Sequence, residues 1–146
     1  MLYFAYGSNM SLTQMKERLG KTIKPIGIGI LYGYALYFNK SPGGYANIRE
    51  TANEKVFGVV YELTDEDIKK LDSYEGVPKD YEKKFVEIEL GGAGKRIKCF
   101  TYVAVKTDDN LKPKKEYLKR IIEGAKENNI PEEYIKEIKM KAGICM

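Results

Sequence analysis

The sequence predicts an α+β fold, because strand-like and helix-like segments share one chain. Residues 81–90 and 95–105 alternate apolar with polar side chains on either side of the glycine-rich run 91–94, which is typical of a β-hairpin. Residues 113–128 instead repeat apolar side chains at the spacing of an α-helix. No linker or repeat divides the chain, so we expect one domain over residues 1–146.

Composition narrows the class of protein. The chain has 146 residues, of which 43% are hydrophobic, and this is enough for a buried core. No run approaches the ~20 apolar residues of a membrane span, and no basic segment precedes the apolar run at the start, so we expect neither a membrane segment nor a signal peptide. Cys99 and Cys145 form no disulfide or metal-site pattern. These features favour a cytoplasmic protein with free thiols.

The absence of histidine restricts the chemistry. A chain with no histidine cannot use Ser-His-Asp or Cys-His catalysis, or histidine-ligated metals. Carboxylates, lysines, tyrosines and backbone amides remain as candidate groups. The net charge of +4 comes from interleaved positive and negative residues, which is typical of a solvated surface rather than a nucleic-acid-binding face.

The first candidate site lies in residues 2–10, an apolar run that ends in Gly7, Ser8 and Asn9. It predicts a buried strand and a tight turn. Ser11 is a suitable helix N-cap, and Gln14 completes a capping-box pattern with it. Backbone amides of such a turn, placed before a helix N-terminus, can receive an anion. The alternative is an ordinary connection in which glycine and asparagine only supply turn conformations.

Residues 27–63 read as strands separated by one loop. Apolar and aromatic side chains recur at every second position of 30–38, so we expect them to share one face of a strand bent by nearby glycines. Residues 41–44 have the composition of a loop that can cover a pocket. A short strand over 45–49 and a second, mostly buried strand over 56–63 follow.

Glu75 is the second candidate site residue. Thr64 is a suitable N-cap for a short helix, and Gly76 ends that helix directly after Glu75. A carboxylate at the negative end of a helix dipole should have a raised pKa, and more so if it is partly buried. Such a group is suited to general acid–base catalysis, whereas the alternative is a solvated acid at a frayed helix end.

Tyr117 belongs to the helix expected over residues 113–128. Its position on the apolar stripe is explained most simply by packing in the core. A tyrosine there can equally turn its hydroxyl into a pocket.

The sequence resembles the γ-glutamylcyclotransferase family, within the AIG2-like superfamily, over nearly its whole length. The turn and the glutamate described above both belong to the matching motifs, and their combination is more specific than either alone. The matching segments, in chain order, are Phe4-Ala5-Tyr6-Gly7-Ser8-Asn9, Gly58-Val59-Val60-Tyr61, Leu71-Asp72-Ser73-Tyr74-Glu75-Gly76-Val77 followed by Tyr81, and Gly124-Ala125-Lys126-Glu127-Asn128 followed by Ile130-Pro131 and Tyr134.

This resemblance implies a mixed-sheet, partly closed β-barrel flanked by helices, in an enzyme that converts γ-glutamyl compounds to 5-oxoproline and releases an amino acid or amine. It implies Glu75 as the catalytic acid/base and a substrate-binding set of Tyr6, Gly7, Ser8, Asn9 and Tyr117. It implies a small-molecule substrate and neither a metal nor a cofactor, and it fits a monomer or a homodimer. The chain is shorter at both ends than the animal members, which bears on the choice of substrate.

Three alternative functions remain open at this point. The enzyme can be a γ-glutamylamine cyclotransferase, or it can remove a γ-glutamyl protecting group from a biosynthetic intermediate. The chain can also be a non-catalytic protein that binds a small molecule, although binding alone does not require a glutamate with a raised pKa.

Overall fold

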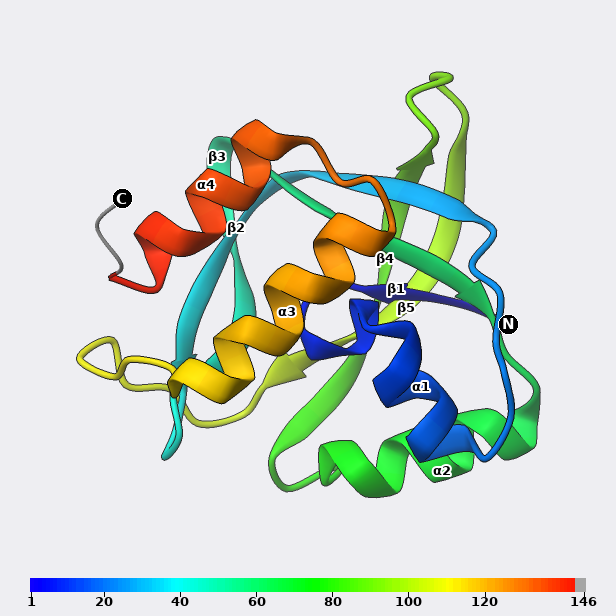
Figure 1. Ribbon diagram of the computed structural model, residues 1–146, viewed down its shortest axis with the longest axis horizontal. Coiled ribbons are helices and arrows are strands. Elements are labelled where there is room, and N and C mark those ends of the chain that lie inside the picture. Colours follow the sequence, from blue (N-terminus) through cyan, green and yellow to red (C-terminus); the bar gives the residue numbers. More distant parts are fainter. Residues whose placement is uncertain (144–146) are drawn as a thin grey trace.

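The computed structural model describes residues 1–143, and Cys145 lies outside the described residues. It confirms the α+β class, with five strands, four α-helices and one short 3₁₀ helix (Figure 1). In chain order these are β1 (Leu2–Ala5), η1 (Ser8–Met10), α1 (Leu12–Leu19), β2 (Gly27–Lys40), β3 (Tyr45–Glu62), α2 (Asp65–Glu75), β4 (Tyr81–Leu90), β5 (Arg96–Ala104), α3 (Lys115–Glu127) and α4 (Glu132–Lys141).

The five strands form a closed barrel in the order β1-β3-β2-β4-β5. Neighbouring strands are antiparallel except for β1 and β5, whose parallel pairing at Tyr3 and Phe100 closes the barrel. The sequence predicted a partly closed barrel, whereas the observed barrel is closed. β1 can close the barrel because both of its edges pair, with β3 on one side and with β5 on the other, and because three of its four residues are buried.

The long hairpin of β2 and β3 differs from the alternation expected for residues 30–38. Leu31 is buried whereas Tyr32 is exposed, and beyond Gly33 the buried positions include Leu36 and Phe38. Tyr32 pairs with Lys55 and Tyr34 pairs with Glu50, so two positions along β2 correspond to five along β3, and the inward face of β2 moves from odd to even positions across this irregularity. The predicted bend is therefore confirmed, but the prediction of a single apolar face over residues 30–38 was wrong.

Two element boundaries also differ from those expected. Residues 45–49 and 56–62 belong to a single strand, β3, because Glu50 and Lys55 in its polar middle section still pair with β2, and the strand ends at Glu62. Helix α3 begins at Lys115 rather than at Pro113, with Lys114 as its N-cap. Pairing across the hairpin thus outweighs local polarity in β3.

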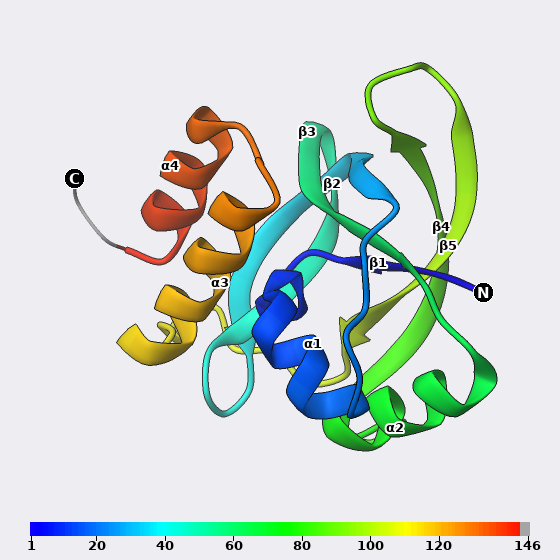
Figure 2. The same cartoon turned by 45° about the vertical axis from the view of Figure 1, so that its right-hand side comes forward.

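The helices lie on two sides of the barrel. In Figures 1 and 2, α3 and α4 run together along the β2–β3 side, while α1 and α2 lie together near one end. The β4–β5 hairpin projects on the side away from α3 and α4 (Figure 2). Helix α3 also crosses η1, so the turn after β1 is held between the barrel and a helix.

Cys99 is a free, fully buried thiol inside the barrel wall. Among the described residues, no helix combines the length and the apolar character needed to cross a bilayer. The same residues contain no group of three or more potential metal ligands.

Candidate active site

A cavity of about 340 Å³ opens at the end of the barrel where β1 leaves it. It brings together all six of the site residues predicted from the sequence. Its walls come from η1, α1, the β2–β3 turn, the end of α2, β4, β5 and the start of α3. The lining residues are Tyr3, Tyr6, Gly7, Ser8, Asn9, Gln14, Arg18, Lys40, Tyr45, Ala46, Tyr74, Glu75, Asp80, Tyr81, Tyr102 and Tyr117.

Glu75 is the last residue of α2, and local sequence explains its position. Thr64 and Asp67 form a complete capping box at the start of the helix, and Gly76 ends it in the left-handed conformation, with φ of 66°. The Glu75 side chain is only 17% exposed. Its Oε1 accepts a hydrogen bond from Asn9 Nδ2 at 3.0 Å and lies 3.6 Å from an Arg18 guanidinium nitrogen. The carboxylate therefore lies against the turn that follows β1.

Burial raises the pKa of Glu75 above its ordinary value, because removal from water disfavours the charged form. The Arg18 cation and the Asn9 hydrogen bond oppose this shift, since both stabilise the carboxylate. The direction agrees with the sequence expectation, which invoked both the helix dipole and partial burial, and burial is the largest cause of the shift. A carboxyl group balanced in this way can both accept and return a proton.

Asn9 connects the turn to Glu75 and to α1. Its Nδ2 donates to Tyr3 Oη at 2.9 Å and to Glu75, and its Oδ1 accepts from Gln14 Nε2 at 2.9 Å and Arg18 at 3.1 Å. The side chain is buried and uses all of its hydrogen-bonding capacity. Asn9 therefore has a fixed orientation and fixes Glu75 in turn.

The turn itself is a single 3₁₀ turn, η1, between the strand and α1. The Met10 and Ser11 N–H groups bond back to the Gly7 and Ser8 carbonyl oxygens. In the described part of the chain, the Ser8 and Asn9 N–H groups have no backbone or side-chain acceptor. Because both belong to the cavity-lining segment, they can donate to an anion in the cavity.

The Gln14 side chain does not form the capping box that the sequence predicted. Ser11 does cap α1 by accepting from the Gln14 N–H. The Gln14 side chain does not return to the Ser11 backbone, however, because Nε2 donates to Ser8 Oγ at 2.6 Å and to Asn9. Gln14 therefore supports the site and was missed as a site residue.

Tyr117 lies where Gly7 and Ala46 meet. Its hydroxyl accepts from the Ala46 N–H at 2.9 Å, and its ring packs edge-on against Tyr45. A Cβ atom on Gly7 would come within 3.1 Å of Ala46 Cβ and 3.6 Å of the Tyr117 hydroxyl. Gly7 thus leaves the space that this contact needs. Tyr117 is both packed and part of the cavity wall, so the two alternatives posed by the sequence are not exclusive.

Buried tyrosines form the floor of the cavity. The Tyr6 hydroxyl donates to the Tyr102 carbonyl oxygen, the Tyr102 hydroxyl to Asp72 at 2.7 Å, and the Tyr81 hydroxyl to the Ala46 carbonyl at 2.8 Å. Burial raises the pKa of each of these three hydroxyls, so they stay protonated and act as fixed donors. Of these, only Tyr6 was among the predicted site residues.

Three charged lining residues were not predicted. Arg18 follows Gln14 by four positions, so both lie on one face of α1, and this spacing was an available signal. Lys40 ends β2 and Asp80 precedes β4, and they meet with 3.4 Å between Nζ and Oδ1. Nothing local in the sequence indicates that pairing, because it depends on how two distant strands enter the barrel.

The C-terminal end of α3 holds the turn from the outside. Glu127 Oε1 accepts from the Leu12 N–H at 2.6 Å, and Asn128 Nδ2 donates to the Met10 carbonyl at 2.7 Å. Gly124 lies so close that a Cβ atom there would be 2.5 Å from Ser11 N. This explains why the segment 124–128 accompanies the turn motif in the sequence.

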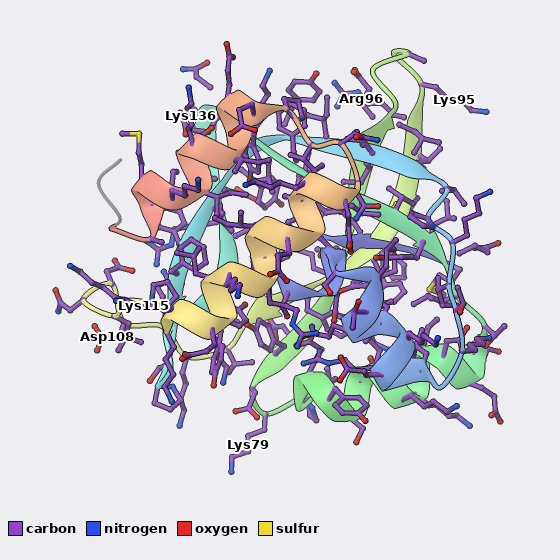
Figure 3. All side chains as sticks on the ribbon, viewed as in Figure 1. Lys79, Lys95, Arg96, Asp108, Lys115 and Lys136 are labelled. Atoms are coloured by element: carbon purple, nitrogen blue, oxygen red, sulfur yellow. The ribbon has the colours of Figure 1, made fainter. Side chains whose placement is uncertain are left out.

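Charged side chains elsewhere on the molecule point outward. Figure 3 shows Lys79, Lys95, Arg96, Lys115 and Lys136 at separate places around the periphery, directed away from the barrel. Several surface lysines pair with acids, among them Lys119 with Glu123. These charges do not gather on one face in this view, which agrees with the expectation of a solvated surface.

Comparisons with known proteins identify the family. The AIG2-like family model matches residues 55–138. Human gamma-glutamylcyclotransferase is 33% identical over 94% of this chain and 77% of its own length, and the bovine protein is 32% identical over 94% and 76%. A solved structure of a gamma-glutamyl cyclotransferase superimposes with a TM-score of 0.88 at 30% identity, covering 95% of this chain and 86% of the other. The chain therefore belongs to the γ-glutamylcyclotransferase family of enzymes.

Proposed function

We propose that this enzyme cyclises the γ-glutamyl group of a small substrate to 5-oxoproline and releases the attached amino acid or amine, with Glu75 as general acid/base. The observation that carries the proposal is the placement of the Glu75 carboxylate. Its Oε1 is held by Asn9 and Arg18, while Oε2 has no hydrogen-bond or ion-pair partner in the described chain. One oxygen is thus fixed and the other is available to a substrate in the cavity.

The reaction needs no nucleophile from the protein, because the substrate carries one. The α-amino nitrogen of the glutamyl group attacks its own γ-carbonyl carbon, forming the ring C–N bond. Glu75 accepts a proton from the α-ammonium, which frees the nitrogen lone pair for the attack, and delivers it to the nitrogen of the leaving amine as the second C–N bond breaks. The ring nitrogen loses its second proton as it becomes the lactam N–H, and the released amine takes up that proton. Protons and bonds balance without another reactant, and this suits a chain that lacks histidine.

The turn after β1 supplies the anion site in this proposal. The Ser8 and Asn9 N–H groups bind either the oxyanion that forms on the γ-carbonyl oxygen or the α-carboxylate of the glutamyl group. Tyr6, Gly7 and Tyr117 shape the wall beside this turn, and they hold the substrate folded for ring closure. Fixed geometry is the main requirement, because an extended glutamyl chain rarely brings its two reacting atoms together.

The test of this function is product release from a panel of γ-glutamyl amino acids and γ-glutamyl amines. We expect 5-oxoproline and the free amino acid or amine to appear in equal amounts, without added metal or cofactor. The panel also separates a γ-glutamylamine cyclotransferase, or an enzyme that removes a γ-glutamyl protecting group, from an enzyme that prefers amino acids. Binding of these substrates without any 5-oxoproline would instead support a non-catalytic binding protein.

A further inference from the structure

The cavity contains a second cation, and nothing in the proposed mechanism uses it. We propose that Lys40 binds a carboxylate on the leaving group, so that the enzyme favours γ-glutamyl amino acids over γ-glutamyl amines. This inference rests on the proposed function and adds a residue that determines specificity.

The first argument is the burial of Lys40. Its side chain is only 8% exposed, although the residue lies beside a hairpin turn at the end of β2. The ammonium lies 5.7 Å from the centre of the Tyr45 ring and 5.6 Å from that of Tyr81. Removing an ammonium from water is costly unless charged or polar groups replace the lost hydration. Lysines rarely occupy such a position without a partner.

The second argument is that the partners present do not satisfy the ammonium. A lysine ammonium has three donors, and within residues 1–143 its one anionic partner is Asp80, at 3.4 Å. The Asp80 carboxylate is itself 51% exposed, so it is a weak counter-ion in contact with water. The aromatic rings add attraction for a cation but accept no conventional hydrogen bond. Lys40 therefore retains donors for an anion that enters the cavity.

The third argument concerns which anion that is. A γ-glutamyl amino acid has an α-carboxylate on the glutamyl group and a second carboxylate on the leaving amino acid. The α-carboxylate lies one carbon from the ammonium that Glu75 deprotonates, so it belongs near Glu75, where Arg18 and the turn amides are available. Lys40 lies outside ion-pair distance of Glu75 and on a different wall, formed by the β2–β3 turn and β4. That position suits the carboxylate that departs with the leaving group.

Asp80 has a defined part in this arrangement. Its backbone N–H donates to the Gly76 carbonyl at 2.7 Å, which keeps it beside the end of α2. Its carboxylate faces Lys40, and an arriving carboxylate has to compete with it. Removal of the Asp80 charge should therefore strengthen the recognition of an anionic leaving group.

The experiment compares γ-glutamylalanine with γ-glutamylethylamine, which differ only in the leaving group's carboxylate. For each protein we would measure the ratio of kcat/KM for the first substrate to kcat/KM for the second. Lys40→Met should lower this ratio by about tenfold or more, as expected for the loss of one charge-assisted contact. Asp80→Asn should raise it. Lys119→Met removes an equal charge from a side chain that is 77% exposed, and it should leave the ratio at the wild-type value.

Two results would overturn the assignment. An unchanged ratio in Lys40→Met, with both substrates slowed equally, would mean that Lys40 binds the glutamyl α-carboxylate, acts through its charge on the pKa of Glu75, or supports the fold. An unchanged ratio with neither substrate slowed would remove it from substrate binding altogether. If Lys40→Met does not fold, Asp80→Asn decides alone, because it retains the lysine. No 5-oxoproline from either substrate with the wild-type enzyme would contradict the proposed function instead.

Discussion

Arg18 and Asn9 decide the protonation state of Glu75 at the scale of single residues. Both approach the same carboxylate oxygen and stabilise the ionised form against the effect of burial. Lys40 also lowers the pKa of Glu75, and Asp72 raises it. A base with a raised pKa holds a proton strongly enough to carry it to the leaving group, provided that it still ionises. In the proposed mechanism, the balance between burial and these neighbours sets the pH range of activity.

Arg18→Gln should move the acidic limb of the pH profile of kcat/KM to higher pH. The Arg18 cation lowers the pKa of Glu75, so its removal leaves the raising effect of burial less opposed. Glu75 must be ionised to accept a proton, and a higher pKa means that activity is lost at a higher pH as the solution is acidified. The measurement is 5-oxoproline release across pH, with Arg120→Gln as the control.

Arg120 is a suitable control because it lies on the outer side of α3, where it pairs with Glu17. Its loss removes the same charge without changing the surroundings of Glu75. A limb that stays in place in Arg18→Gln, or moves equally in both variants, would contradict a direct action of Arg18 on Glu75.

At the scale of elements, the site depends on how α3 holds η1. The turn carries the amides proposed to bind an anion, and its conformation is fixed from one side by β1 and from the other by Gly124, Glu127 and Asn128. A three-residue 3₁₀ helix has little stability of its own. The contacts with α3 supply the conformational stability that the local sequence of η1 does not provide.

Gly124→Ala should displace the turn and reduce both stability and activity. The added Cβ would lie 2.5 Å from Ser11 N and 2.6 Å from Met10 C, and backbone atoms cannot move aside as a flexible side chain does. We expect a loss of about 1–3 kcal/mol in the free energy of unfolding, as for other overpacked contacts. The measurements are denaturant unfolding and kcat. Glu123→Ala, at an exposed position on the same helix, should change neither by much, and equal behaviour of the two variants would contradict this role of the contacts with α3.

Several elements could be predicted from local sequence, and the reasons are physical. Thr64 and Asp67 at one end of α2 and Gly76 at the other fix that helix through short-range hydrogen bonds, so the position of Glu75 on it could be read directly. The register shift near Gly33 and the single long strand β3 depend on pairing with a partner strand. Local alternation cannot report such pairing.

At the scale of the whole molecule, closure of the barrel joins the parts of the site. Phe100 on β5 packs against Tyr3 on β1 at a ring-centre distance of 5.1 Å, where the two strands close the barrel. Phe100→Ala should lower the free energy of unfolding by about 3–5 kcal/mol, because it leaves a cavity in a fully packed region. Phe85 pairs with Phe100 across the ladder but is exposed on the outer surface.

Phe85→Ala is therefore the matched control, with the same substitution on a neighbouring strand. We expect it to cost far less than Phe100→Ala in the same urea titration. Equal losses for the two variants would contradict the view that the β1–β5 closure is the critical packing of the barrel.

The residues that form the site could be predicted only in part from the sequence. The turn and Glu75 each carry a local signal, and the family resemblance joined them. Gln14 was assigned to a capping box, because the sequence does not show that its side chain has a better partner in Ser8. Lys40 and Asp80 gave no signal at all, since the pairing of a buried lysine at the end of β2 with a half-exposed aspartate just before β4 is a product of the closed barrel.

The most direct test of the account is kcat for 5-oxoproline release by Glu75→Gln, compared with the wild-type enzyme and with Glu123→Gln. Glutamine keeps the shape of the side chain and its acceptor for Asn9 but cannot transfer a proton. The account predicts a fall of about a hundredfold or more in kcat for Glu75→Gln, and a wild-type rate for Glu123→Gln, which changes an exposed acid on α3. Wild-type kcat in a folded Glu75→Gln variant would show that Glu75 is not the general acid/base.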